Sequence, residues 1–153
     1  MSGFVAAGKA PAGHLHTDAF WPSINLDDVR GTLRIDASVT AIRLKTATLS
    51  AAISVNREFA EWRRTRQAEG YTTLIDVPAD QVEGMSHYVH LYQRAIYAAA
   101  GAEICERYRS YDSTNSGHQN ADDLTPSIDE LRRDQRWAVR DFLGIGRTTV
   151  ELI

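Results

Sequence analysis

Residues 86–108 read SHYVHLYQRAIYAAAGAEICERY, and this stretch decides the fold. Ser86 is a favoured residue for the N-terminal cap of a helix. After it, two lines of residues recur at helical spacing. The first line is Val89, Tyr92, Ile96, Ala99 and Glu103, and the second is Tyr88, Leu91, Ala95, Ala98, Ala102 and Cys105. Because a helix that is apolar over so broad an arc needs cover on more than one side, the stretch predicts a long helix buried on more than one side in an all-α fold.

The first long helix of the chain is predicted before it, over residues 40–68, and Gly70 ends this helix as a C-terminal cap. One face of this helix is expected to point inward, and it carries Ile42, Leu49, Ile53, Asn56, Phe59 and Ala60. Residues 71–85 then form a connector, broken by proline and glycine, whose apolar residues pack down on the body.

A third long helix is predicted after a polar loop over residues 112–123. Thr125 suits its cap, and Pro126 suits its first position, where a missing amide hydrogen does no harm. Its inner stripe is expected to be Ile128, Leu131, Gln135, Ala138 and Phe142. Gly144 and Gly146 end it, so the fold has three long helices.

The N-terminal part adds a short helix and an arm. Residues 1–17 are small, glycine-rich and aperiodic, which predicts a flexible arm. Phe20 and Trp21 are expected to anchor this arm to the body. Asn25 is a suitable cap for a short helix with two aspartates, 27 and 28, in its first turn.

The C-terminal residues 147–153 are predicted to be an interaction tail that follows a helical body over residues 18–146. Apolar and polar residues alternate in this β-prone tail, which has no partner strand in a helical chain. It is therefore expected to bind the body weakly or to add a strand to another subunit or partner. The candidate residues are Thr148, Thr149, Val150, Glu151, Leu152 and Ile153.

Composition limits the classes of function. A chain of 153 residues, 43% of them hydrophobic, fits one domain with an ordinary core. Its net charge of −3 excludes a global basic field for nucleic acid, so contact with DNA needs a local patch. Cys105 is the single cysteine, which suits a reducing compartment. No secretory signal or membrane-spanning run is present, so synthesis in the cytoplasm and no membrane partner are expected.

No residue pattern indicates catalysis. The phosphate-binding, nucleophile-elbow and zinc-protease motifs are absent, so no catalytic residue, metal or cofactor is predicted. His87 and His90 have a spacing that suits a metal, but surface or cap positions explain them better. The aspartates at 112, 122 and 123 are better explained as a solvated loop than as an acidic site. Cys105, among apolar residues, is expected to be an inert thiol.

Arginines form the most regular charge pattern. Arg132, Arg136 and Arg140 recur every four residues and line one face of the third long helix. Arg57 and Arg64 lie on the first long helix. Three interpretations stay open for the face on the third helix: a solvated surface with internal ion pairs, a contact between subunits, or the lining of a channel for DNA.

Five stretches together resemble one known family. They are FWPSINLDDVRGTLRID (20–36), SVNREFAEW (54–62), GYTTLIDVPADQVEG (70–84), RAIYAAAGAEICERYRSYD (94–112) and LRRDQRWAVRDFLGIGRTTVELI (131–153). In this order they resemble the head completion, or head stabilisation, proteins of temperate contractile-tailed bacteriophages. The resemblance covers residues 20–153, and residues 1–17 fall outside it.

The resemblance implies a structural virion protein of the phage neck, assembled in the host bacterial cytoplasm. Such a protein binds below the portal after DNA packaging as a ring, expected to have twelve copies. There it helps retain the genome and gives the tail a platform. The implied partners are further copies of the chain, the portal protein, tail-terminator or neck proteins, and packaged double-stranded DNA in the channel. The alternative function is a helical DNA-binding module that uses the arginine face.

Overall fold

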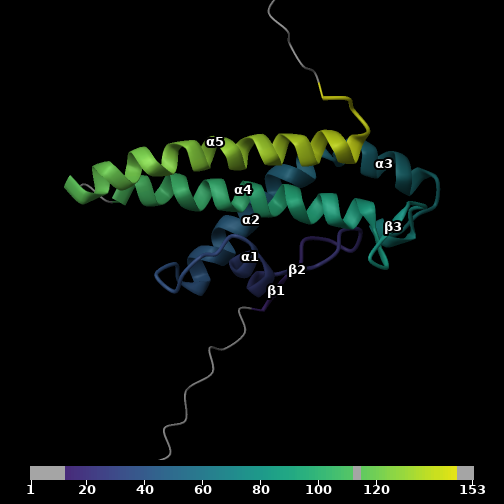
Figure 1. The fold of residues 1–153 in the computed structure, drawn as a ribbon. Coiled ribbons are helices and arrows are strands. Elements are labelled where there is room, and N and C mark those ends of the chain that lie inside the picture. The colour runs from purple at the N-terminus through teal and green to yellow at the C-terminus, as the bar shows by residue number, and fades with distance from the viewer. Residues whose placement is uncertain (1–12, 112–114, 148–153) are drawn as a thin grey trace, which may run out of the picture.

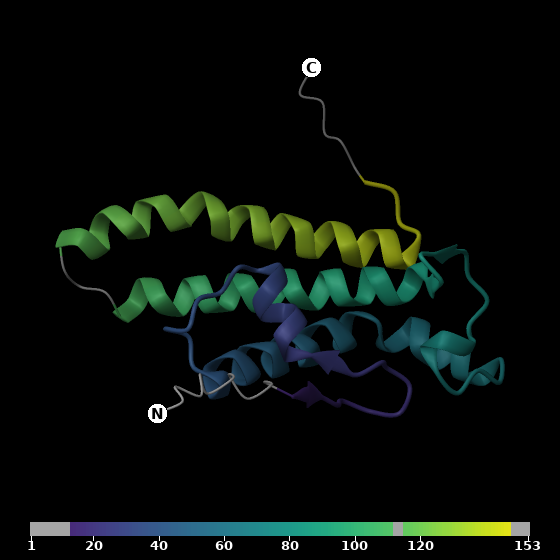
Figure 2. The same cartoon turned by 60° about the horizontal axis from the view of Figure 1, so that its bottom comes forward.

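The long helix predicted over residues 86–108 is α4, which spans His87–Tyr111 (Figure 1). The computed structural model describes residues 13–111 and 115–147, with side chains at residues 13–107 and 128–147. The backbone amide of Tyr88 donates to Ser86 Oγ at 3.2 Å, so Ser86 caps the helix as predicted. Figure 2 shows α4 between α5 and α2, and it contacts both. The broad apolar surface of α4 is therefore covered on more than one side.

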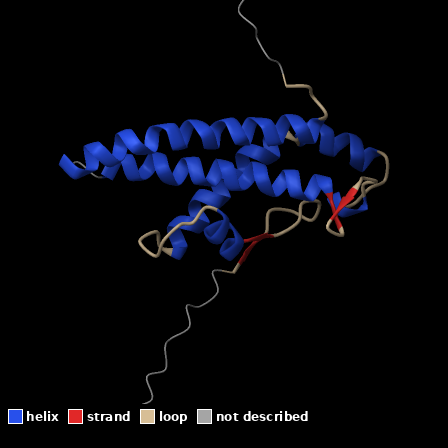
Figure 3. Cartoon of the chain, viewed as in Figure 1, coloured by secondary structure: helices blue, strands red, loops and turns tan. Residues whose placement is uncertain are grey.

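Helices make up most of the described part of the chain, and the strands are very short (Figure 3). The helices are α1 (Leu26–Thr32), α2 (Ala41–Glu58), α3 (Ala60–Ala68), α4 (His87–Tyr111) and α5 (Asn115–Leu143), with a short 3-10 helix η1 (Leu74–Asp76). The strands form two antiparallel ribbons, β1 (His14–Leu15) with β2 (Ile24–Asn25) and β3 (Gln81–Val82) with β4 (Met85–Ser86). The mainly helical class is confirmed, whereas the expected set of three long helices and one short helix is not.

The helix predicted over residues 40–68 is divided at Phe59. Phe59 has φ −91° and ψ 1°, and it separates α2 from α3. Its ring is fully buried and stacks on Phe142 with ring centroids 4.0 Å apart. The helical hydrogen bonds continue across the junction, because Phe59 N donates to Val55 O and Arg63 N donates to Phe59 O. Periodicity alone does not reveal this break, because the helical spacing continues through it.

The inward face predicted for this helix was wrong at three positions. Ile42, Leu49 and Ile53 are exposed on the outside of α2. The residues of α2 that the core buries are Leu44, Ala47, Thr48, Ala51, Ala52 and Val55. Both arcs of α2 are apolar, and packing against α4 selected the arc with the smaller residues.

Helix α5 begins eleven residues earlier than predicted, at Asn115 instead of Pro126. Most of the expected polar loop is therefore helical, and Pro126 lies inside the helix. The composition of this segment favours a loop, but α4 extends to Tyr111 and offers α5 a long surface to pack on (Figure 2). Tertiary contacts of this kind commonly override weak local preference.

The N-terminal segment is held against the body by aromatic packing. Phe20 and Trp21 are almost fully buried, as predicted for anchors. The Trp21 ring stacks on Tyr92 of α4 with centroids 4.7 Å apart and an interplanar angle of 3°. The strand β1 falls inside the segment expected to be an arm, and its Leu15 is buried. The described chain is therefore packed on the body from this strand onward.

The helix caps lie at the residues that the sequence predicts. The side chain of Asn25 accepts from Asp27 N at 2.9 Å at the start of α1, as predicted. Gly70 and Gly144 have φ of +102° and +69°, which only glycine adopts without strain. After Gly144, Ile145 N donates to Arg140 O at 2.9 Å, and this bond closes the end of α5.

Candidate interaction surfaces

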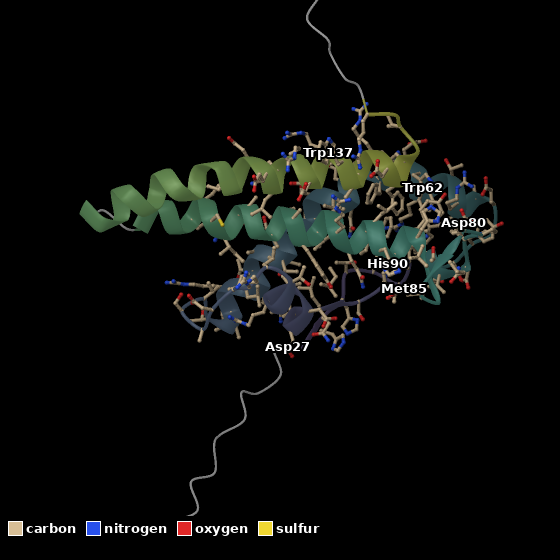
Figure 4. All side chains as sticks on the ribbon, in the orientation of Figure 1. Asp27, Trp62, Asp80, Met85, His90 and Trp137 are labelled. Atoms are coloured by element: carbon tan, nitrogen blue, oxygen red, sulfur yellow. The ribbon has the colours of Figure 1, made fainter. Side chains whose placement is uncertain are left out.

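His87 and His90, near the start of α4, contact the β3–β4 hairpin. His87 N donates to Asp80 O at 2.9 Å, and His90 Nε2 lies 2.9 Å from Val82 O. These contacts tie the β3–β4 hairpin to the N-terminal end of α4, where Figure 4 shows Asp80, Met85 and His90. Within residues 13–111 and 115–147, no three metal-binding side chains come together. In the same residues no helix is long and apolar enough to cross a membrane.

The arginine row on α5 is bound largely within its own chain. The Arg132 guanidinium reaches across to Glu106 of α4, with Nη2 at 2.9 and 3.0 Å from the two carboxylate oxygens. Arg140 Nη2 donates to Gly146 O at 2.6 Å. Arg136 is exposed between them. Of the three arginines, Arg136 is thus the one that faces solvent most freely.

The arginines predicted on the first long helix lie on different helices. Arg57 is exposed on α2, and no ion pair to it is found in the described part of the chain. Arg64 is exposed on α3 and pairs with Glu61 one turn earlier. An exposed pair of this kind contributes little to stability. Arg57 therefore remains available for a partner, while Arg64 is already paired.

The candidate tail, residues 148–153, lies outside the described residues. Its starting point is Arg147, which pairs with Asp141 at 2.7 Å. The Arg147 guanidinium also lies over the Trp137 ring, 4.5 Å from its centroid, and Arg133 lies 4.8 Å from the same ring. The last described residue is thus held on the outer side of α5, where Figure 4 labels Trp137.

Two groups of exposed apolar side chains were not foreseen as surface features. The first group, which we call the α2 outer stripe, is Ile42, Leu49 and Ile53, with 78%, 42% and 55% of their surface exposed. The second group, the hairpin patch, is Val82 and Met85, which pair across the β3–β4 ribbon, together with Ile75 of η1 earlier in the same connector, with 52%, 40% and 69% exposed. Single exposed apolar residues are ordinary, but grouped ones mark contact surfaces. The helical spacing of the first group was visible in the sequence and was assigned to the core.

A groove lies between α1, α4 and α5. The part beside residues 90–98 of α4 has a volume of about 360 Å³ and is lined by Leu33, Tyr97 and Leu131, among others. The adjoining part, beside residues 101–105 of α4, reaches Cys105, which is half-buried. Burial, with help from Glu106, raises the pKa of the Cys105 thiol. A raised pKa suppresses the reactive thiolate, which agrees with the expected inert thiol.

These features define a mainly helical protein whose distinctive exposed groups are apolar side chains on α2 and on the β3–β4 hairpin and arginines on α2, α3 and α5. The model of the family "Phage head completion protein (GPL)" matches residues 15–153. The head completion/stabilization protein of Escherichia phage P2 is 41% identical over 147 residues, which cover 96% of this chain and 86% of that protein. No solved structure matches the chain significantly. The chain belongs to the phage head completion protein family, as the five sequence stretches predicted.

Membership in this family establishes the coarse role. The protein is a virion-associated structural protein that takes part in completing the phage head. The family is a structural one and not a known class of enzyme, in line with the lack of a catalytic pattern in the sequence.

Proposed function

We propose that this protein completes the head by binding below the portal as a ring after DNA has been packaged. In the neck it helps retain the genome and offers the tail a platform. The ring is expected to hold twelve copies, one for each portal subunit. The observation that carries the proposal is the family match over nearly the whole chain, from residue 15 to residue 153.

The surface supports a role in assembly. The α2 outer stripe leaves three branched apolar side chains in water, which is unfavourable unless a partner covers them. The net charge of −3 and the internal partners of Arg132 and Arg140 weigh against the alternative of a DNA-binding module. An assembly protein is therefore favoured over a nucleic-acid reader.

The tail is the candidate for the contact with the portal or a neighbouring copy. A β-prone segment after a closed helix end can add a strand to a partner sheet. Deleting residues 148–153 should leave the free chain folded and abolish its incorporation into heads. Normal incorporation of the shortened chain would remove the tail from the mechanism.

The first test is to mix the purified full chain with assembled portal rings and to measure the mass of the complex. One copy bound for each portal subunit supports the proposal. No complex at any ratio, together with binding to double-stranded DNA that weakens steeply with salt, would instead favour the DNA-binding alternative.

A further inference from the structure

The α2 outer stripe lies opposite the core face of its helix and is flanked by positive charge. Its three residues are separated by seven and four positions, so they form one line about 16 Å long. Arg43, Lys45 and Arg57 are the charged residues of α2 before its last position. No ion pair to any of these three is found in the described part of the chain, and all are exposed. Glu58, the last residue of α2, points away toward Gln135 of α5.

The hairpin patch has the opposite charge. Between Tyr71 and Gln93 the chain carries Asp76, Asp80 and Glu83 and neither lysine nor arginine. All three acids are exposed. Asp76 accepts hydrogen bonds from the hydroxyls of Thr72 and Thr73, at 3.1 and 2.8 Å. For Asp80 and Glu83, no ion pair occurs within residues 13–111 and 115–147.

Glu83 occupies a backbone conformation that does not favour glutamate. With Gly84 it forms the two-residue turn between β3 and β4, and both residues have positive φ, 49° and 73°. Asparagine and glycine are the usual residues in such a turn. A glutamate there costs roughly 1 kcal/mol in backbone strain, and strain of this kind is often kept where the side chain has a task. The turn places a carboxylate at the tip of the hairpin patch.

The two surfaces cannot meet within one chain. The hairpin is held to the start of α4 by the contacts of His87 and His90. Figures 1 and 4 place it at one end of the elongated body, beyond α3, while α2 runs back toward the other end. An apolar surface with positive charge and an apolar surface with negative charge are therefore presented on separate parts of the same molecule.

We propose that the hairpin patch of one copy docks on the α2 outer stripe of the next copy. Apolar side chains then cover one another, and the acids at 80 and 83 face Lys45 and Arg57. A contact between two different surfaces is heterologous, and on a portal that sets the rotation between neighbouring copies its repetition closes into a ring. This inference rests on the proposed function, since it takes copies of the chain to assemble side by side, and it names the surfaces that meet.

Each patch is small, with three apolar side chains. A stable interface commonly buries about 800 Å² on each partner, so this contact alone is expected to be weak in solution. Copies held side by side on a portal ring have a high local concentration, which makes a weak contact effective. The portal-bound complex is thus the right material for the test.

Cross-linking tests the proposal directly. Cys105→Ala gives a cysteine-free chain, and Ile53→Cys or Val82→Cys then places one thiol on either surface. Portal rings are loaded with equal amounts of the two chains and treated with a flexible bismaleimide, which joins thiols over a range of spacings. We expect cross-linked pairs from the mixture, none from either chain alone, and ladders of many copies from a chain with both thiols.

Other outcomes overturn the proposal in distinguishable ways. Pairs formed by Ile53→Cys alone would indicate a symmetric contact of α2 with itself. A cross-link from Ile53→Cys to the portal subunit would give the stripe a different partner. Full loading of the portal without any cross-link between copies would reject the inference and leave the proposed function intact. Failure to load the portal with the cysteine-free parent chain would reject the proposed function itself.

Charge variants give a second, independent test. Glu83→Lys and Lys45→Glu should each reduce cross-linking roughly five- to tenfold, and the two together in one chain should restore most of it. Glu83→Asn is the sharpest variant, because asparagine suits the turn and so preserves the fold while removing the charge. It should reduce cross-linking, whereas Glu130→Gln, an exposed acid on α5, should not. Unchanged cross-linking in Glu83→Asn and Glu83→Lys would remove charge complementarity, and with it the proposal.

Discussion

Arg30 shows how one charged side chain organises a segment without regular structure. It is buried in α1, and its guanidinium donates to Asp36 O at 2.7 Å and to Val39 O at 2.9 Å. These bonds hold the loop between α1 and α2. Nothing in the sequence marked this arginine out from the others, because its partners are backbone carbonyls that become neighbours on folding.

Replacing Arg30 with methionine keeps much of the apolar stem and removes the donors. Two carbonyls then lose a charged partner, which should lower the free energy of unfolding by about 1.5–3 kcal/mol. Urea denaturation measures this loss. Arg43→Met, at an exposed site, is the control and should change the value by less than about 0.5 kcal/mol. Equal effects at the two sites would show that the loop does not depend on Arg30.

Tyr92 joins α4 to α2 through its hydroxyl, which donates to Asn56 Oδ1 at 2.9 Å. Tyr92→Phe should lower the free energy of unfolding by about 0.5–1.5 kcal/mol. Tyr97→Phe is the control, since its half-buried hydroxyl makes no hydrogen bond in the described part of the chain. Urea denaturation near neutral pH should separate the two variants.

The same tyrosine predicts a pH dependence. Burial raises the pKa of the Tyr92 hydroxyl above its usual value, so the neutral form is favoured in the folded chain. Its contribution is complete below the pKa of the unfolded chain, about 10, and is lost as the pH rises above that value. The unfolding free energy should therefore fall less above pH 10 in Tyr92→Phe than in the parent chain. Parallel curves for the two proteins would contradict the burial argument.

At the scale of the elements, the close packing of α5 and of the segment after α1 against α4 depends on a glycine. Gly101 lies in α4, and a Cβ atom built there would come 2.9 Å from Leu33 Cδ2 and 3.3 Å from Leu131 Cδ1. The absence of a side chain at Gly101 lets Leu33, which follows α1, lie against α4. The groove that Gly101 lines therefore owes part of its space to the missing side chain at this position.

Gly101→Leu should lower the free energy of unfolding by about 1–3 kcal/mol, because the added side chain overfills this junction. Gly31→Ala is the matched helix glycine, with no atom within 4 Å of its added Cβ. It should raise the free energy of unfolding by about 0.5–1 kcal/mol through helix preference alone. Thermal unfolding of both variants measures the contrast. A stabilising effect of both would mean that the junction is loosely packed.

At the scale of the whole molecule, two complementary surfaces predict cooperative assembly. If each copy touches its neighbour, a portal ring that has bound some copies binds further ones more tightly. Native mass spectrometry of portal rings with limiting protein should then show mainly empty and full rings. Ile53→Gln should give intermediate, random occupancy instead, at a similar affinity for the first copy.

Ile145→Gln is the control for this variant, since Ile145 is an exposed apolar residue outside both patches. It should leave the distribution of empty and full rings unchanged. Random occupancy in the parent chain would mean that copies bind the portal independently, without contact between neighbours.

The features that sequence predicted best are those whose cause lies within a few residues. Asn25, Ser86, Gly70 and Gly144 begin or end helices as expected, because each acts on backbone groups of its own turn. The family was also visible, since it rests on the order of residues along the chain. Arg132, Arg136 and Arg140 lie on one helix, α5, but the bonds of Arg132 to Glu106 and of Arg140 to Gly146 depend on neighbours that only folding supplies.

The sequence by itself determined that this chain is mainly helical, where α4 lies, how its helices are capped, and which family it belongs to. Only the tertiary structure decided which arc of α2 is buried and where α5 begins. Periodicity treats both apolar arcs of a helix alike, and Ile42, Leu49 and Ile53 were therefore assigned to the core. Close packing favours burial of one arc over the other, because the small residues Ala47 and Ala51 let α2 approach α4. The larger residues were left outside, where they form the surface that we assign to a neighbouring copy.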